Sequence, residues 1–424
     1  MITLNITTSA AGEESRAPES VQRNVKVPGI SIRLGDGKMS MDKLNERGQR
    51  TLELIKRSPT EEILTEERLT EFIAGGVRLK HYIGFEISGF VHLGTGLLSM
   101  GKIADLQSAG IDTNIFLADY HSWINKKLGG DLPTIKRVAG GYFKEALKLS
   151  LKCAGGDPEK TNFVLGSDLY ERLGRDYFEN VLKIASSMSL SRARRSVTVL
   201  GRREGDEISL SQLVYVPMQA ADIFGLEVNI AHAGMDQRKA HVVALDSSGS
   251  FTYKPVALHH HLLMGVHITE PQRDAILKAR AAKDRTLLED QLIDIKMSKS
   301  KPNGAIFIHD TEEEIRKKIR GSFCPVNEVE VNPIIDLMRY VVAPYSVRNG
   351  LSLEVVNGKT NQSTTFPDMT SLEAAYTGGK IHPADLKVTV AESLVKILEP
   401  ARKFFLEGNG RKHLEKMKEI EITR

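Results

Sequence analysis

The chain has 424 residues, of which 41% are hydrophobic and 26% charged, as in soluble globular proteins with two or three domains. Its 58 lysines and arginines against 54 aspartates and glutamates leave a net charge of +4, too small to identify a nucleic-acid-binding protein or to exclude one. The sequence has no run of about 18 apolar residues and no secretory leader pattern, so we expect a cytoplasmic protein without a membrane span.

The N-terminal stretch is rich in Ser, Gly, Pro and charge and shows no sustained apolar period, which predicts a disordered extension over residues 1–45. Folded structure is expected to begin near Asn45. The segment Ser58-Pro59-Thr60-Glu61 then has the pattern of a helix start, with Ser58 as the capping residue and Pro59 in the first turn.

Strand and helix patterns alternate beyond this point. Short apolar strands are predicted at residues 81–85, 114–118 and 162–165, and helices at residues 94–110 and 133–151. This order predicts an α/β fold with a parallel sheet and helices on both of its faces. In such sheets ligands bind beyond the carboxyl ends of the strands, so motifs at strand ends are expected to carry the chemistry.

Near Asp310 the alternating strand and helix patterns give way to helical patterns. Thr311-x-x-Glu314 is a capping box at the start of a charged helix, and His382-Pro383 opens a second helix. We therefore expect an α/β domain over residues 46–310 and a separate, mostly helical domain over residues 311–424. Within the first domain, the charged stretch 269–292 is predicted to be an inserted surface helix.

The first motif lies at the junction of the first strand and helix, where His92, Gly94 and Thr95 follow a glycine-containing turn. The unpaired N–H groups of a helix start suit phosphate, and a glycine lets a nucleotide approach the backbone closely. His92 could donate a hydrogen bond to a phosphate oxygen. Taken alone, the motif is weak and is better explained as a histidine in a turn.

The second motif is Lys296-Met297-Ser298-Lys299-Ser300-Lys301, which precedes Pro302-Asn303-Gly304. Three lysines in six residues form a basic loop that could close over a triphosphate and stabilise charge moving onto pyrophosphate. A solvated surface loop is the alternative. No Walker loop and no G-x-G-x-x-G motif is present, so the usual competing phosphate motifs are absent.

Together the two motifs are the signature of class I aminoacyl-tRNA synthetases, and the chain resembles the archaeal and eukaryotic tyrosyl-tRNA synthetases over residues 46–406. The resemblance rests on residues 82–95, 117–121, 166–168 and 215–219, on Asp222, on residues 234–239, on the lysine loop and on residues 382–386. It implies a Rossmann-type catalytic domain with a connective insertion, followed by a helical anticodon-binding domain. It also implies ATP and Mg²⁺, L-tyrosine and tRNA-Tyr as ligands, and a homodimer.

The resemblance also assigns residues to roles. The tyrosine-binding set is Tyr82, Glu86, Tyr215, Gln219, Asp222 and Gln237, in which Tyr82 and Asp222 would hold the phenol hydroxyl. The ATP-binding set is His92, Gly94, Thr95, Lys296, Met297, Ser298, Lys299 and Ser300, with His92, Gly94, Lys296 and Lys299 as the catalytic residues. The tRNA-binding set is Asp385, His382, Arg238 and Lys239.

Some positions depart from the family pattern or carry a plainer interpretation. Thr95 stands in place of the more common histidine, and Ile87 stands where many relatives have proline. Without the family, Tyr82 and Asp222 would be interpreted as a core tyrosine and a surface aspartate. His259-His260-His261 is not expected to bind a metal, because neighbouring residues in a strand point to opposite faces.

Three other functions compete with this interpretation. A tryptophanyl-tRNA synthetase shares the fold, but the Tyr82–Asp222 pair argues against it. A non-catalytic RNA-binding paralogue would be expected to have lost its lysine loop, which is intact here. A simple nucleotidyltransferase would lack the C-terminal helical domain.

Overall fold

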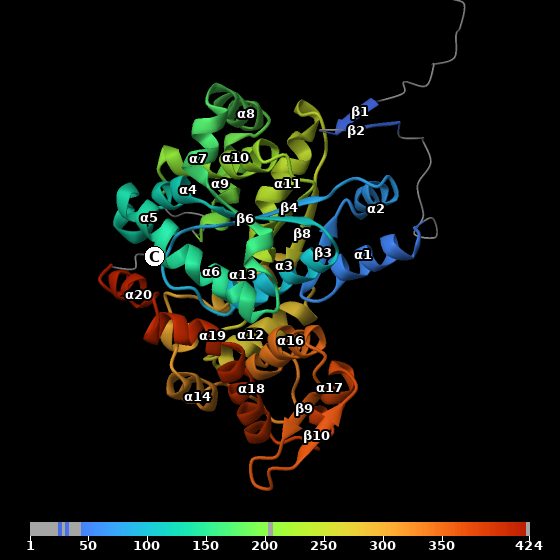
Figure 1. Ribbon diagram of the computed structural model, residues 1–424, viewed down its shortest axis with the longest axis vertical. Coiled ribbons are helices and arrows are strands. Elements are labelled where there is room, and N and C mark those ends of the chain that lie inside the picture. Colours follow the sequence, from blue (N-terminus) through green and yellow to red (C-terminus); the bar gives the residue numbers. More distant parts are fainter. Residues whose placement is uncertain (1–23, 28–29, 34–43, 202–206, 421–424) are drawn as a thin grey trace, which may run out of the picture.

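The computed structural model describes residues 24–27, 30–33, 44–201 and 207–420 (Figure 1). Its centre is a six-stranded sheet in the order β3-β8-β7-β4-β5-β6. The strands are β3 (Thr60–Leu64), β4 (Lys80–Phe85), β5 (Asp112–Leu117), β6 (Thr161–Leu165), β7 (Ile230–Gly234) and β8 (Val256–His260). Five strands run parallel and β3 pairs antiparallel with β8 at one edge, so the parallel sheet is confirmed with one reversed strand added.

Helices cover both faces of this sheet (Figure 1). They are α1 (Glu46–Lys56), α2 (Glu66–Ala74), α3 (Ser99–Ser108), α4 (Asp119–Ile124), α5 (Leu132–Val138), α6 (Lys144–Cys153), α7 (Gly166–Leu173), α8 (Arg175–Ser186), α9 (Leu190–Arg195), α10 (Leu210–Gly225) and α11 (Arg238–Ser247). The two long helices predicted from the sequence are present, and each contains a widened π-helical turn, Gly94–Leu98 before α3 and Ala139–Phe143 between α5 and α6. Such turns are frequent at functional sites.

The predicted helix start at Ser58 is wrong. Helix α1 ends at Lys56, the hydroxyl of Thr60 donates to the carbonyl of Ile55 over 2.7 Å, and Thr60 then enters strand β3. The capping pattern at Ser58 is local, whereas β3 satisfies its backbone hydrogen bonds through β8, some 200 residues later in the chain. The following helix begins only at Glu66.

The charged stretch 269–292 forms a pair of helices instead of the single helix predicted. These are α12 (Glu270–Ala281) and α13 (Arg285–Ile295), and each has its own N-cap, Thr269 with a capping box and Asp284. Ile276 and Ile295 are buried in a small apolar cluster with Ile268. The pair leads directly into the lysine loop.

The elements after α13 gather at one end of the molecule (orange to red in Figure 1). They are α14 (Glu312–Arg320), α15 (Pro333–Leu337), α16 (Ala343–Arg348), α17 (Met369–Thr377), α18 (Pro383–Ile397), α19 (Glu399–Arg402) and α20 (Arg411–Lys418), with the antiparallel pair β9 (Leu353–Val356) and β10 (Ser363–Phe366). The capping box of Thr311 and Glu314 at α14 is confirmed, as is the helix that follows His382. The β9–β10 hairpin was not predicted.

One apolar cluster runs through both parts of the chain. It contains Ile83, Leu97 and Leu147 around the central sheet, and Leu394 and Phe405 from the C-terminal helices. All five side chains are at most 3% exposed. The C-terminal helices therefore share a continuous core with the α/β part.

Within the extension predicted to be disordered, the structure describes β1 (Asn24–Val27) and β2 (Ile30–Arg33), which pair antiparallel. The other residues of 1–43 lie outside the described residues. None of the helices in the described ranges is long and apolar enough to cross a membrane.

Candidate active site

The residues of the two sequence motifs meet beyond the carboxyl ends of β4, β7 and β8. Glu86 follows β4, the segment containing Asp236 and Gln237 follows β7, and the lysine loop follows α13. This is the edge of the sheet at which the sequence placed the chemistry. Most of the predicted site residues are found here in contacting groups.

A buried polar group contains the two residues predicted to bind a phenol. Tyr82 lies in β4 and Asp222 in α10, and they are 2% and 1% exposed. Burial raises the pKa of Asp222 to about 8, and burial together with the charge of Asp222 raises the pKa of Tyr82. A methyl group on Gly84 would lie 3.3 Å from the Tyr82 hydroxyl, so the glycine keeps this side of the ring open.

Three further residues, which were not assigned from the sequence, belong to this buried polar group. The Tyr177 hydroxyl donates to Asp222 Oδ1 over 2.9 Å, and Nε2 of His121 lies 3.5 Å from Asp222 Oδ2. The ring of Tyr170 stacks on that of Tyr177 with centroids 4.1 Å apart. His121 lies within a segment that carries the family resemblance, but Tyr170 and Tyr177 lie outside those segments.

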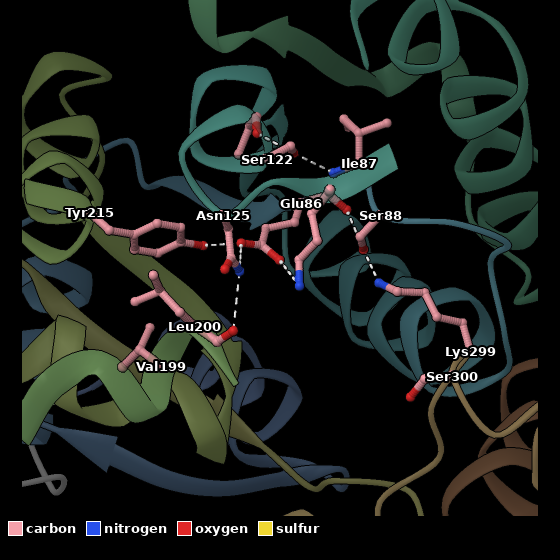
Figure 2. Close-up of polar contacts among 12 residues, drawn as sticks. Glu86, Ile87, Ser88, Ser122, Asn125, Val199, Leu200, Tyr215, Lys299 and Ser300 are labelled. Carbon is pink, nitrogen blue, oxygen red and sulfur yellow. Dashed lines mark hydrogen bonds and ion pairs between the residues drawn. The ribbon is translucent and has the colours of Figure 1, made fainter. Parts of the chain in front are cut away.

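A second group surrounds the carboxylate of Glu86 (Figure 2). Its Oε1 accepts hydrogen bonds from the Tyr215 hydroxyl at 3.0 Å and from the Asn125 amide at 2.8 Å. The ammonium group of Lys127 lies 3.7 Å from Oε2. Glu86 and Tyr215 were predicted to act together; Asn125 and Lys127 were not identified from the sequence.

Gln219 and Gln237 also meet. The Gln219 amide donates to Gln237 Oε1 over 3.3 Å, and the Gln237 amide donates to the carbonyl of Val199 over 3.1 Å. The buried Oε1 of Gln219 has no protein partner, which leaves an acceptor for a ligand donor. The six residues of the tyrosine-binding set therefore form three pairs. Glu86 contacts Tyr215, Gln219 contacts Gln237, and Tyr82 lies close enough to Asp222 for the carboxyl charge to raise its pKa.

At the first motif, His92 accepts hydrogen bonds through Nδ1 from the backbone N–H groups of Gly94 at 3.2 Å and Thr95 at 3.4 Å. The proton of the neutral ring is therefore on Nε2, which lies 3.3 Å from the Thr95 hydroxyl. Burial, with the nearby charges of Lys299 and Lys296, lowers the pKa of His92 to about 3. His92 can therefore act as a neutral Nε2–H donor. The Thr95 hydroxyl is close enough to accept a hydrogen bond from it.

The backbone N–H of Ile87, where the family resemblance suggests a proline, has a partner. Its backbone N–H donates to the Ser122 hydroxyl over 2.7 Å (Figure 2). A proline there would have no N–H to donate. The contact joins the turn after β4 to helix α4.

The lysine loop contacts the site through two of its lysines. Lys296 pairs with Asp236 over 2.6 Å, and Lys299 donates to the hydroxyl of Ser88 (Figure 2). Burial and the charge of Lys127 lower the pKa of Lys299 to about 7. A cation held in a buried position close to other lysines is poised to bind an anionic ligand.

The rest of the loop is held by its own contacts. The buried Met297 donates its backbone N–H to the carbonyl of Leu263 over 2.7 Å, and the hydroxyls of Ser298 and Ser300 lie 2.9 Å apart. Lys301 points away, with its ammonium group 2.8 Å from the carbonyl of Asp294.

The residues of the tRNA-binding set lie in two places. Arg238 makes hydrogen bonds of 3.0 and 2.8 Å to Glu62, and Lys239 donates to Thr198 over 3.1 Å, both beside the active site. His382 caps α18 by accepting from Ala384 N, and Asp385 lies in the first turn of the same helix.

The three consecutive histidines do not converge on one point. His259 contacts His241, His260 contacts His232, and His261 lies between two carboxylates. Among the described residues there is no group of three His, Cys, Asp or Glu side chains that could hold a metal ion.

Comparison with known proteins agrees with this arrangement. Residues 76–399 match the family described as tRNA synthetases class I (W and Y). The tyrosine–tRNA ligase of Thermococcus gammatolerans is 47% identical over 394 residues, which cover 89% of this chain and 99% of the relative; that of Thermococcus kodakarensis is 46% identical over the same coverage. The crystal structure of tyrosyl-tRNA synthetase from Pyrococcus horikoshii complexed with L-tyrosine has a TM-score of 0.79 at 43% identity and covers 88% of this chain and 99% of its own. The chain therefore belongs to the class I tRNA synthetases of the tryptophan and tyrosine family, and within it to the tyrosine–tRNA ligases.

Proposed function

We propose that the chain activates L-tyrosine with ATP, giving tyrosyl-adenylate and pyrophosphate, and then transfers the tyrosyl group to tRNA-Tyr. The observation that carries this proposal is the buried Tyr82–Asp222–Tyr177 group. It offers the Tyr82 hydroxyl as a donor and the Asp222 carboxyl group as an acceptor to a phenol, while the Tyr177 hydroxyl donates to Asp222. It lies in one site with the Glu86 group and the lysine loop. A buried polar group without a ligand partner costs free energy, so this arrangement favours a ligand that carries a hydroxyl.

The amino-acid substrate spans the three pairs of the tyrosine-binding set. Its phenol hydroxyl lies between Tyr82 and Asp222, and its ammonium group lies among the oxygens of Glu86, Tyr215, Gln219 and Gln237. Carboxylate and amide oxygens suit an ammonium group. This orientation directs the tyrosine carboxylate towards the nucleotide side of the site.

ATP occupies the side formed by the first motif and the lysine loop. The His92 Nε2–H donates to a phosphate oxygen, Gly94 allows the nucleotide to lie against the backbone, and Thr95, Met297, Ser298 and Ser300 line the rest. Lys296 and Lys299 stabilise the charge that moves onto pyrophosphate when the tyrosine carboxylate attacks the α-phosphate. No enzyme nucleophile takes part, so catalysis consists of positioning and charge stabilisation.

Mg²⁺ enters this scheme as part of the MgATP substrate. An ion of this kind usually keeps several waters and is held mainly by substrate phosphate oxygens. Bound in this way it neutralises phosphate charge.

The proposed function is tested by pyrophosphate exchange into ATP with a panel of amino acids that includes phenylalanine and tryptophan. We expect exchange with tyrosine alone at low amino-acid concentration. Exchange that prefers tryptophan would instead make the chain a tryptophan enzyme, and binding of tRNA without any exchange would make it a non-catalytic paralogue.

The C-terminal part, residues 311–424, is proposed to bind the anticodon, with Asp385 reading its first base. Asp385 Oδ1 accepts from the backbone N–H of Gly358 over 2.9 Å and Oδ2 from the Asn357 amide over 3.1 Å, in the turn between β9 and β10. The carboxylate thus sits between the start of α18 and an exposed turn. Guanine offers two adjacent N–H donors on its Watson–Crick edge, which one carboxylate can accept, and single-stranded bases are the usual targets of RNA readout.

Asp385→Ala is expected to relax the preference for guanine at the first anticodon position by about 1–3 kcal/mol, by analogy with bidentate base contacts in DNA. Pyrophosphate exchange should be unchanged, because the active site lies elsewhere. The measurement is the charging rate of tRNA-Tyr with guanine and of a transcript substituted at that base.

The matched control is Asp368→Ala. Asp368 caps helix α17 in the same part of the chain by accepting from Ser371 N over 2.8 Å. It should lose stability without changing base preference. If Asp385→Ala kept the wild-type preference for guanine, the role of Asp385 would be structural, namely to hold the turn between β9 and β10 against α18.

We also propose that the protein works in the cytoplasm as a homodimer. The dimer is supported by exposed apolar side chains on three adjoining helices: Phe178 and Leu182 on α8, Leu190 on α9 and Leu210 on α10, from 49 to 79% exposed. Helix α10 packs against both α8 and α9, and exposed apolar side chains on neighbouring helices favour an interaction surface.

Phe178→Glu combined with Leu182→Glu is expected to convert the dimer into a 47.0 kDa monomer, because it places two charges on this face. Sedimentation equilibrium measures the mass. Val347→Glu, at an equally exposed apolar position on α16, should remain dimeric. A wild-type protein that sediments as a monomer would refute the proposed dimer.

A further inference from the structure

A chain of buried histidines crosses the central sheet and ends at the nucleotide-binding motif. His81 in β4, His232 in β7 and His260 in β8 lie on three neighbouring strands and are at most 5% exposed. His81 Nε2 lies 2.9 Å from His232 Nδ1, and His232 Nε2 lies 2.7 Å from His260 Nδ1. His260 Nε2 lies 3.4 Å from the hydroxyl of Ser99 at the start of α3.

The last hydrogen bond fixes the direction of the others. The Ser99 hydroxyl donates its only proton to the carbonyl of Gly94 over 3.1 Å, so it must accept from His260 Nε2–H. His260 Nδ1 then accepts from His232 Nε2–H, and His232 Nδ1 accepts from His81 Nε2–H. The buried Nδ1 of His81, which has no partner, is therefore a bare lone pair. Burial lowers the pKa of His81 and His260 to about 3, which keeps the chain neutral.

His260 contacts the first motif through Ser99 and lies near the partner of the lysine loop. Through Ser99 it reaches the carbonyl of Gly94, whose N–H is already held by His92. On its other side it pairs in register with Gly234, where an added methyl group would lie 3.6 Å from His260 Nε2 and 2.7 Å from Oδ1 of Asp236, the partner of Lys296.

We infer that His260 and Ser99 are positioning residues for ATP, which hold the backbone of Gly94 in place through this histidine chain. The inference rests on the proposed function, because it takes Gly94 to contact the nucleotide. Neither side chain touches the reacting atoms. Their effect is on the geometry of the widened turn that begins at Gly94.

The chain supplies a matched control on the opposite face of β8. His241 and His259 are also buried and share a hydrogen bond of 3.0 Å, but this pair leads to Glu62, away from Gly94. His241→Asn therefore removes a buried imidazole contact of the same kind without touching the nucleotide motif.

The test measures the Kd of ATP by calorimetry, without amino acid, together with the melting temperature. Ser99→Ala and His260→Asn should each weaken ATP binding about tenfold, roughly the loss of one hydrogen bond, whereas His241→Asn should lower the melting temperature and leave ATP binding within about twofold. His260→Gln, which keeps a donor near the Nε2 position, should bind ATP more tightly than His260→Asn. The KM of tyrosine should not change in the variants.

Wild-type affinity for ATP in Ser99→Ala would overturn the inference even if His260→Asn failed to fold, because the serine substitution is small. Equal weakening by His241→Asn would also overturn it and make the effect one of general stability. If the wild-type protein showed no tyrosine-dependent pyrophosphate exchange, the proposed function would be refuted instead. The ATP-binding measurements would still decide the role of the histidines.

Discussion

Asp222→Ala is expected to remove most of the preference for tyrosine over phenylalanine in the activation step. Asp222 is buried, and Tyr177 donates to its Oδ1. When phenylalanine occupies such a site, the polar groups around the missing hydroxyl stay buried and unpaired. Sites of this kind reject the analogue by about 10⁴–10⁵, a range for which known tyrosyl-tRNA synthetases are themselves the reference case.

The measurement is the ratio of kcat/KM for tyrosine and phenylalanine in pyrophosphate exchange. Most of the change in this ratio should come from a lower kcat/KM for tyrosine. The kcat/KM for phenylalanine should stay level or rise. Tyr177→Phe is the companion variant: it removes one hydroxyl that contacts Asp222 and should reduce the preference by a smaller factor. Full discrimination in Asp222→Ala would show that the phenol binds elsewhere.

Lys299→Ala is expected to reduce the rate of tyrosine activation by about 10²–10³, the usual cost of removing one group that stabilises transition-state charge. Lys299 reaches Ser88 from the loop, and burial with the charge of Lys127 lowers its pKa to about 7. A bound triphosphate favours the protonated form, so the full positive charge is present when pyrophosphate leaves.

Single-turnover formation of tyrosyl-adenylate separates this effect from binding, since the Kd of tyrosine should be unchanged. The matched control is Lys301→Ala in the same loop, whose ammonium group contacts the carbonyl of Asp294 instead of the site. The rate of tyrosyl-adenylate formation in Lys301→Ala should stay within about threefold of the wild type, because an exposed charge that does not contact the site has little effect. Similar losses in both variants would assign the effect to the basic character of the loop as a whole.

The sequence predicted those parts of the structure that depend on local patterns. The capping box at Thr311 and the proline after His382 mark helices because neighbouring residues satisfy the first N–H groups. The same reasoning failed at Ser58, where an equally good local pattern lost to strand pairing with distant β8. A capping pattern carries no information about a strand so far along the chain.

The candidate site divides in the same way. The predicted tyrosine-binding residues fall together, because three of them lie in or directly after the neighbouring strands β4 and β7 and the other three lie on helix α10, which leads into β7. Tyr177 and Asn125 were missed since they reach the site from helix α8 and from the end of helix α4, where nothing in their own neighbourhood marks them as polar partners. The chain of histidines was equally hidden, because its members are 151 and 28 residues apart in sequence and meet only through strand order.

The apolar cluster shared by the central sheet and the C-terminal helices has a consequence for how the protein unfolds. On folding, one cluster buries side chains from both parts: Ile83 and Leu97 from the α/β part, and Leu394 and Phe405 from the C-terminal helices. Removing residues 311–424 would therefore expose the apolar side chains that they cover, and neither part can melt without uncovering the other. Heating should produce a single cooperative transition across both parts, so that the active site and the C-terminal helices lose their structure together.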